Sequence, residues 1–294
     1  MARPSEYLTT RELAELLRIK ERKIYDLAAS GKVPCSRATG KLLFSRTQIN
    51  TWLADNSSGF STASSKPRAS VFLGSHDPLL EWALMQSRSG LASFFDSSFD
   101  GLERYQNHEG IATGLHLYDV ATGQWNVPVI ATRFSSEPIV LVEWAWRNRG
   151  LIVAAGKGDE FKDITSLAGK RFVPRQREAG SQQLFKHLLE TAEMTLEQLE
   201  FITPARGETY AAQAVQEGKA DAAFGLEALA KQYQLDFIPV TKERFDLLVD
   251  RRFWFEPAMQ KFISFCSQTS FRNRAKELGG YDISNLGHVL FNGR

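Results

Sequence analysis

The first 55 residues carry apolar side chains at the spacing of three short amphipathic helices. Residues 11–19 place three leucines on one helical face, behind two threonines that can cap a helix. Residues 21–31 repeat the pattern and end at a glycine suited to a helix C-terminus, and residues 46–54 bury a third apolar set. Between the last two, residues 32–45 hold a glycine between two extended runs, which predicts a β-hairpin. This is the element order of a winged helix-turn-helix.

From residue 69 onward, short apolar runs alternate with amphipathic stretches. The strand-like runs are at 70–74, 91–97, 111–119, 137–146, 151–155, 170–175, 199–204, 220–225 and 235–240. The helical stretches between them are at 75–87, 99–110, 182–192, 209–218 and 227–234. Such alternation predicts an α/β fold with parallel strands, and the length of this part suits two lobes.

Residues 56–70 separate the two patterns. They contain six serines, a glycine and a proline, and they have too little apolar surface to offset the entropy of ordering. We therefore predict a winged helix-turn-helix domain at 1–55, a serine-rich linker at 56–70 and a two-lobed domain at 71–294.

Charge supports the same division. The whole chain is nearly neutral, with 36 Lys and Arg against 34 Asp and Glu. Residues 1–68 hold twelve basic and six acidic side chains, a balance of +6, whereas residues 69–294 hold 24 and 28, a balance of −4. A basic N-terminal piece on an acidic body indicates nucleic-acid binding, although a chance surface imbalance would look the same.

Several classes are excluded by what the sequence lacks. No apolar run reaches the ~18–20 residues of a membrane span, and the N-terminus has no apolar signal region, so we expect a cytoplasmic protein without a membrane partner. Two distant cysteines provide neither a disulfide framework nor a zinc ligand set.

Short motifs refine the N-terminal prediction. They are YLTTRELA at 7–14, IYDL at 24–27, SGKVP at 30–34 and SR at 45–46. With them, residues 6–54 resemble the excisionase/MerR-type DNA-binding domain, in which the second helix enters the major groove and the wing touches the flanking backbone or minor groove. Lys20 stands where this family usually has a Ser or Thr helix cap.

The resemblance implies a set of DNA contacts. On the front of the recognition helix they are Glu21, Arg22, Lys23 and Tyr25, and beside the wing turn they are Arg37 and Lys41. Arg or Lys can read guanine edges, while Tyr and the wing residues would reach phosphates. The alternative is a protein-interaction module with a solvated basic face.

The second part also carries motifs. They are GSHDPLL at 74–80, GLHLYD at 114–119, WNVP at 125–128, PRQ at 174–176, AGSQ at 179–182 and GKADAAFG at 218–225. With them, residues 70–294 resemble the periplasmic-binding-protein superfamily, in particular the PBP-like domain found behind excisionase-type modules and on some molybdopterin-biosynthesis proteins. The resemblance implies a two-lobed, type II sensor domain.

Ligands of open α/β sheets bind at the carboxyl ends of strands, facing helix N-termini. The candidates at such positions are Ser75, His76, Ser97, Ser98, His116, Arg175, Gln176, Arg177, Gly180, Ser181, Gln182, Ala223 and Gly225. Arginine, serine and a helix N-terminus together form an oxyanion clamp. Each type also has an ordinary structural role: helix capping for the serines, solvation for the arginines, and hydrogen bonding within the fold for the histidines.

These features predict a ligand-responsive transcriptional regulator that binds operator DNA as a dimer or larger oligomer. For the effector we expect an oxyanion, molybdate or tungstate, or a related molybdenum-cofactor metabolite, from the clamp and from the resemblance. The alternative is a small organic acid or other metabolite. The sequence has no G-x-S-x-G, P-loop or H-E-x-x-H motif, so we predict no catalytic residues, no metal site and no covalent cofactor.

Overall fold

The computed structural model of the chain describes residues 6–37, 40–55 and 68–294. Contacts divide it into two units, Met1–Pro67 and Arg68–Arg294. Most of the predicted linker, residues 56–67, lies outside the described residues. Its last residues belong to the second unit, where Arg68 is buried and its Nε lies 3.0 Å from Oδ2 of Asp250.

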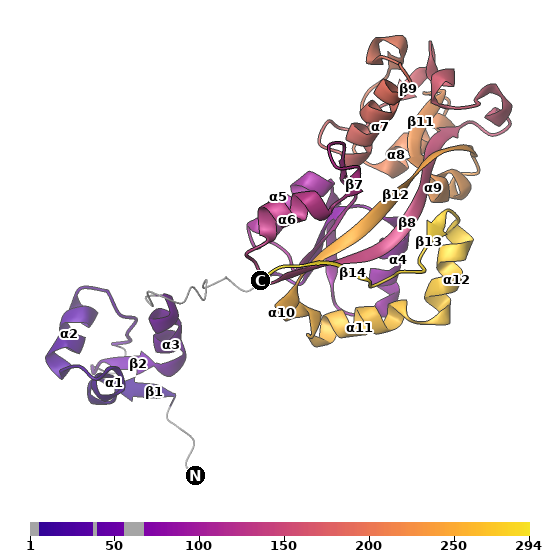
Figure 1. Cartoon of the computed structure of the whole chain (residues 1–294). Helices are drawn as coiled ribbons and strands as arrows, with labels where there is room; N and C mark the ends of the chain where they lie inside the picture. Colours follow the sequence, from indigo (N-terminus) through magenta and orange to yellow (C-terminus); the bar gives the residue numbers. More distant parts are fainter. Residues whose placement is uncertain (1–5, 38–39, 56–67) are drawn as a thin grey trace. The chain divides into compact units, whose positions relative to one another are not determined.

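The N-terminal unit consists of β1 (Tyr7–Thr9), α1 (Thr10–Leu17), α2 (Glu21–Ala29), β2 (Leu43–Ser45) and α3 (Arg46–Asp55) (Figure 1). Its core joins Leu8, Leu13, Ile24, Phe44 and Ile49, so every element contributes a buried side chain. The helix-turn-helix core predicted from the apolar spacing is therefore present.

The helix ends follow local sequence. Thr9 caps α1 in a capping box with Glu12, and Gly31 follows α2 with φ of 67°. At the start of α2, Lys20 occupies the cap position and makes no side-chain cap hydrogen bond. Leu16, one of the three leucines expected on the buried face of α1, is 46% exposed, because α1 turns Ala14 inward instead.

The described part of the predicted hairpin at 32–45 contains one antiparallel bridge, and its second strand also pairs with a strand outside the hairpin. Strand β2 pairs antiparallel with β1, with Leu8 opposite Phe44. Within the predicted hairpin, the described residues form an isolated bridge between Ser36 and Leu43, and residues 38–39 of the turn lie outside the described part. The N-terminal strand, which the apolar pattern did not reveal, pairs along the other edge of β2, while Ser36 and Leu43 keep both backbone hydrogen bonds of the predicted hairpin.

The second unit has two lobes (Figure 1). Lobe 1 contains β3 (Val71–Ser75), α4 (Pro78–Ser87), β4 (Ala92–Asp96), α5 (Ser98–Gln106), β5 (Ala112–Leu115), the hairpin β6 (Tyr118–Asp119) and β7 (Gln124–Trp125), α6 (Val127–Phe134), α10 (Arg251–Trp254), α11 (Pro257–Cys266), α12 (Thr269–Leu278), β13 (Tyr281–Asp282) and β14 (Val289–Asn292). Lobe 2 contains β9 (Arg171–Val173), α7 (Gly180–Thr191), β10 (Glu200–Phe201), α8 (Glu208–Gln216), β11 (Ala222–Leu226) and α9 (Glu227–Gln232), with short 3-10 helices at Gly158–Glu160, Ile164–Leu167 and Leu196–Gln198.

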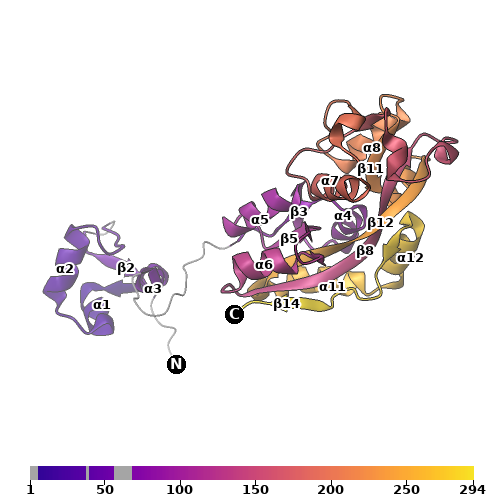
Figure 2. The ribbon, with the colours of Figure 1, turned by 45° about the horizontal axis from the view of Figure 1, so that its top comes forward.

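Two 15-residue strands, β8 (Ile139–Val153) and β12 (Asp236–Asp250), pair antiparallel and cross from one lobe to the other (Figures 1 and 2). The sheet order is β10-β9-β11-β8-β12-β5-β3-β4, and β13 and β14 also pair with β8. Strands β3, β4 and β5 of lobe 1 are parallel to one another, as predicted, and so are β9, β10 and β11 of lobe 2. Both crossing strands run antiparallel to their neighbours, and the β6–β7 hairpin of lobe 1 is antiparallel as well.

The sequence pattern divided β8 into runs at 137–146 and 151–155. The structure joins them because the polar residues between them lie inside the protein: the side chains of Arg147 and Arg149 are at most 1% exposed. A buried ion pair thus allows one strand to continue through what looks like a polar loop.

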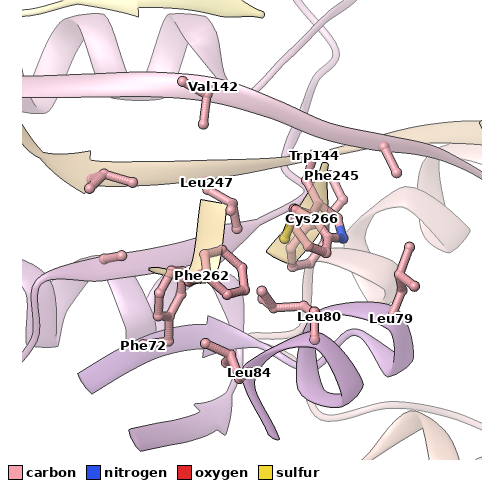
Figure 3. Close-up of a cluster of buried hydrophobic side chains, with 14 of the residues drawn as sticks. Phe72, Leu79, Leu80, Leu84, Val142, Trp144, Phe245, Leu247, Phe262 and Cys266 are labelled. Carbon is pink, nitrogen blue, oxygen red and sulfur yellow. The ribbon is translucent and has the colours of Figure 1, made fainter. Parts of the chain in front are cut away.

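Each lobe builds its core on both faces of its part of the sheet. In lobe 1, α4, α11 and α12 pack on one face around Trp144 and Phe262 (Figure 3), and α5 and α6 pack on the other. In lobe 2, α7 covers one face, where Phe172 and Phe185 stack at 4.5 Å, and α8 and α9 cover the other. In the described residues, no helix is long and apolar enough to cross a membrane.

Candidate ligand-binding site and nucleic-acid interface

A cleft of about 1010 Å³ lies between the two lobes of the second unit. Lobe 1 lines it with His76, Glu81 and the end of β4, and lobe 2 lines it with Gln176, Glu178 and the start of α8. The cleft leads to a smaller pocket of about 60 Å³. That inner pocket is lined by Ser75, His76, Phe95, Asp96, Ser97, His116, Arg175, Ala179, Gly180, Ser181, Arg206, Gly207 and Glu208. Both lobes contribute, as a hinged binding domain requires.

The lobe 1 wall includes hydroxyl groups and the ring of His116, which the fold holds in place, together with Phe95 and Asp96. Ser97 caps α5 by accepting a hydrogen bond from the Asp100 N–H. Ser98 Oγ lies 2.7 Å from Ser75 Oγ and accepts the His116 N–H. The ring of His116 is buried, and its Nδ1 lies 3.0 Å from Glu243 Oε2. Burial lowers the pKa of His116, outweighing the opposing carboxylate of Glu243.

The lobe 2 wall presents an incompletely paired arginine. Arg175 is 8% exposed, and its Nη2 donates to the Arg206 carbonyl oxygen. Its Nε and Nη1 have no hydrogen-bond partner among the described residues. Burial lowers its pKa, yet a guanidinium remains charged in proteins. Buried donors without a partner are costly, so this arginine is poised to receive an anionic group.

The N-terminus of α7 lies beside that arginine. Gly180 and Ser181 begin the helix and line the inner pocket, and Ala179 at the cap position makes no side-chain hydrogen bond. The free N–H groups and dipole of a helix start favour negative charge. Arg175 is fixed from behind, because its backbone N–H donates to Gln182 Oε1 at 2.8 Å.

The inner pocket also contains a carboxylate. Glu208, the first residue of α8, accepts a hydrogen bond at Oε1 from Arg149 Nη2 (2.7 Å), whereas its Oε2 has no partner among the described residues. Burial alone would raise the pKa of Glu208, but Arg149 and Arg175 outweigh it and lower the pKa. An unpaired acceptor thus lies in the same pocket as unpaired donors.

A chain of buried ion pairs connects the lobes beneath the pocket. Asp77 of lobe 1 binds Arg147 at 2.8 Å, Arg147 binds Glu243, Glu243 binds Arg149 at 2.6 Å, and Arg149 binds Glu208 of lobe 2 at 2.7 Å. Burial opposes ionisation of Glu243, but Arg147 and Arg149 hold its pKa well below the ordinary value. The crossing strands β8 and β12 therefore carry a continuous line of charge from lobe to lobe.

The structure brings most of the predicted ligand residues together. Seven of them line the inner pocket: Ser75, His76, Ser97, His116, Arg175, Gly180 and Ser181. Ser98 and Gln182 lie behind it, and Gln176 lines the outer cleft and donates to Asp96 across the lobes at 2.8 Å.

Three predicted residues lie elsewhere. Arg177 is exposed and does not line the described pocket. Ala223 belongs to the apolar core of lobe 2, and the α-carbon face of Gly225 packs against Ile152. Both lie within β11, so the end of that strand faces protein rather than the pocket.

Sequence reasoning missed Glu208 and the charges of the hinge. Arg147 and Arg149 are two residues apart and thus on one face of a strand, which was the available signal once the segment was read as one strand. Glu208 offered no signal, since an acidic residue in a first helical turn is common. Among the described residues there is no group of three or more metal-ligating side chains.

In the N-terminal unit, α2 buries Ile24 and Ala28 and leaves the side chains of the predicted DNA contacts exposed. The exposed side chains are Glu21, Arg22, Lys23 and Tyr25, with Arg37 and Lys41 exposed between α2 and β2. Arg37 Nη2 also donates to the Ala28 carbonyl oxygen at the end of α2, at 3.3 Å. That bond ties the loop to the predicted recognition helix.

Family models match both units. A model described as a helix-turn-helix domain matches residues 7–57, and one described as a PBP superfamily domain matches residues 82–267. Both are families of binding domains, one for DNA and one for ligands, in agreement with the prediction that the chain is not an enzyme.

Individual proteins resemble the chain along its length or in part. The uncharacterized protein YvgK of Bacillus subtilis (strain 168) is 24% identical over 303 residues, covering 96% of this chain and 97% of the relative. An uncharacterized protein of Clostridium pasteurianum, from the 5′ region of a 2Fe-2S ferredoxin gene, is 32% identical over 80 residues, covering 27% of this chain and 71% of the relative.

Solved structures resemble the second unit. The effector-binding domain of QuiR in complex with shikimate has a TM-score of 0.44 at 14% identity, covering 66% of this chain and 92% of that one. The ancestral amino acid-binding protein AncCDT-1 has a TM-score of 0.49 at 12% identity, covering 71% of this chain and 93% of that one.

Proposed function

The chain belongs to the family of PBP superfamily domains and carries a helix-turn-helix domain before it, and we propose that it is a transcriptional regulator whose cleft binds a small anionic effector. One observation supports the effector above all: Arg175 is buried in the inner pocket with two N–H positions unpaired. A ligand oxyanion that accepted hydrogen bonds from Nε and Nη1, beside the start of α7, would offset the free-energy cost of burying these donors without a partner.

For the chemical class we propose a small organic acid that also has a hydrogen-bond donor. The acid group would bind Arg175 and Ser181, and the donor would meet the unpaired Oε2 of Glu208. The outer cleft has room for the rest of such a molecule.

Molybdate or tungstate is the second candidate. The size of the inner pocket and the helix N-terminus suit a tetrahedral oxyanion. However, such a dianion offers acceptors only. It would leave Oε2 of Glu208 without a hydrogen-bond donor, and its negative charge would repel that carboxylate. This is why we rank it behind the organic acid.

The ligand would act by closing the lobes about β8 and β12. We propose that the protein works in the cytoplasm as a dimer or larger oligomer on operator DNA. Paired half-sites require DNA-binding units spaced by a helical turn of ~34 Å or a multiple of it. Closure that altered the spacing or orientation of these units would change affinity for the operator.

Titration calorimetry of the full chain tests the effector. The ligand panel contains small hydroxy acids and amino acids, molybdate, tungstate, sulfate and phosphate. Arg175→Ala is expected to weaken the binding ligand by about 10- to 100-fold, since charge-assisted hydrogen bonds contribute roughly 1.5–3 kcal/mol. Arg177→Ala is the matched control and should bind normally, because Arg177 is exposed outside the pocket.

Glu208→Gln separates the two ligand classes. Loss of the carboxylate should weaken an organic acid that donates to it and strengthen a bare oxyanion by removing repulsion. Absence of heat with every ligand, or equal losses in Arg175→Ala and Arg177→Ala, would contradict the proposed clamp.

DNA binding is tested separately, by mobility shift with the DNA upstream of the protein's own gene. We expect a complex that weakens steeply as salt increases. Absence of any salt-sensitive complex would argue against a regulator, whatever the calorimetry shows.

A further inference from the structure

A second cavity of about 220 Å³ lies in lobe 1, away from the cleft. Its walls come from both crossing strands, from α10 and α11, and from the C-terminal segment. The lining residues are Val142, Glu143, Trp144, Leu247, Val249, Trp254, Met259, Phe262, Ile263, Cys266, Ser267, Leu286 and Gly287. None of them lines the effector cleft described above. Figure 3 shows five of the walls, Val142, Trp144, Leu247, Phe262 and Cys266, together with the core packed below them.

The lining is mostly apolar, and its polar groups are the side chains of Glu143 and Ser267 and the indole N–H of Trp144. Most side chains are aliphatic or aromatic, and Trp144, Met259 and Val249 are at most 1% exposed. Burial raises the pKa of Cys266 to about 12, so its thiol stays neutral and behaves as a small apolar group. A space of this kind offers water few hydrogen bonds. Cavities of about 150 Å³ with similar walls remain dry and admit benzene.

The cavity also has an entrance. Ser267, just after the end of α11, and Gly287, in the C-terminal segment, are both exposed at its edge. Gly287 has φ of 83°, a conformation that favours glycine, and an added Cβ would meet open space. A small molecule can thus reach the interior between these two segments.

The walls connect to the ion-pair chain of the hinge. Trp144 Nε1 donates to Asp77 Oδ1 at 3.0 Å, and Tyr281, on the segment that roofs the cavity, donates its hydroxyl to Asp77 Oδ2 at 2.6 Å. Asp77 in turn binds Arg147. An occupant that shifts the indole or the roof therefore acts on the first member of the chain that leads to Glu208.

We propose that this cavity is a second ligand site, for a small and largely apolar molecule of about the size of toluene or indole, and that its occupancy is linked to the hinge through Trp144 and Asp77. The proposal does not depend on the identity of the cleft ligand. It gives the protein a way to respond to an apolar compound as well as to an anion.

Thermal unfolding of the full chain with toluene and with indole tests binding. At about five times its Kd, either probe should raise the Tm of the second unit by about 2–4 °C. Val142→Phe fills the cavity and should abolish this rise, whereas Val120→Phe, at a position 60% exposed in the β6–β7 turn, should retain it.

Ser267→Trp is the second variant, in case Val142→Phe does not fold. It obstructs the entrance without changing the core and should also abolish the rise, while Ser264→Trp on the exposed side of α11 should not. A rise that persists in both cavity variants, or no rise with either probe up to its solubility, would overturn the site.

Hydrogen exchange tests the link to the hinge. With toluene bound, the amides of residues 143–149 should exchange at least threefold more slowly, and Trp144→Phe, which removes the indole donor but keeps a ring, should lose this protection while still binding toluene. Unchanged exchange in the wild-type protein would overturn the link.

Discussion

Gly180 determines how closely the two lobes can approach. It begins α7, and a Cβ added there would lie 2.8 Å from the His116 carbonyl oxygen across the cleft. Backbone atoms cannot yield as a flexible side chain does, so the lobes themselves would have to separate. Glycine at this position is therefore a requirement of closure, in addition to leaving the helix N-terminus open.

We predict that Gly180→Ala weakens effector binding by about tenfold or more, since small misplacements of a binding group are costly. Calorimetry measures the effect, with whichever ligand of the panel binds the wild-type protein. Gly158→Ala is the control: its added Cβ would meet the Asp236 carboxylate at 3.1 Å, and neither residue lines the cleft or the inner pocket. Equal affinities in both variants would show that the lobes do not close at this point.

Glu243 is the residue on which the hinge charges converge. It is fully buried and pairs with Arg147, Arg149 and His116. Its pKa is lower in the folded protein than in the unfolded chain, so the unfolded state binds more protons as the solution is acidified. Its contribution to stability is therefore complete above the ordinary glutamate pKa of ~4.3 and is lost as pH falls below it.

We predict that Glu243→Gln lowers the unfolding free energy of the second unit by about 3–5 kcal/mol at pH 7, because two buried guanidinium groups lose their carboxylate. The variant should also lose part of the stability change between pH 5 and the acid limit that the wild-type protein shows. Denaturant unfolding at several pH values measures both effects. Glu103→Gln, at an exposed position on α5, should match the wild type.

At the scale of elements, the two first helices differ in how they begin. Helix α1 has a capping box, but α2 starts at Lys20 without a side-chain cap. The first N–H groups of a helix need acceptors, and a Ser, Thr, Asp or Asn cap supplies one. The predicted recognition helix, α2, thus lacks the side-chain cap that stabilises the start of α1.

We predict that Lys20→Ser stabilises α2 by about 1 kcal/mol and that Thr9→Ala destabilises α1 by a similar amount. Hydrogen exchange in the full chain measures each helix separately: the α2 amides should slow about fivefold in the first variant, and the α1 amides should speed up in the second. No change in α2 would mean that its N–H groups already have acceptors of comparable strength.

Helices and strands differ in how well their sequence reveals them. Both α4 and α5 begin at a side-chain cap, with Asp77 and Ser97, and the spacing of apolar residues located them well. Strand β8 was divided in two because burial of Arg147 and Arg149 depends on partners 59 to 96 positions away in the chain. No local pattern contains those partners.

At the scale of the whole molecule, charge is divided between two functions. The basic excess lies in residues 1–68, whereas the effector part is acidic. If the first unit binds DNA, its cations displace the counterions of phosphates, and affinity falls with salt by a slope of about −0.9 for each phosphate contacted.

We predict that Lys41→Ala lowers the magnitude of this slope by about 1 while leaving base preference intact, and that Arg22→Ala costs about 1–3 kcal/mol and relaxes base preference. Fluorescence anisotropy with operator and scrambled DNA at several salt concentrations measures both. Lys276→Ala, at an exposed position on α12, is the control. If it changed the slope as much as Lys41→Ala, the second unit would have to contact DNA as well.

The sequence by itself determined the kinds of element, the helix caps and the division of charge, because these depend on residues within a few positions of one another. Periodicity and turn residues report local geometry, and they located the helix-turn-helix and most strands of the second part. The motifs at strand ends also indicated the lobe 1 and lobe 2 walls of the inner pocket.

Only the tertiary structure decided which distant segments come together. It paired β2 with β1, ran β8 and β12 through both lobes, turned β11 into the core, and brought Glu208 beside Arg175. Each outcome depends on which distant segment supplies a hydrogen bond or a counter-charge, and burial makes that partner indispensable. The ionised state of a buried hinge residue such as Glu243 thus depends on arginines that lie far from it in the chain.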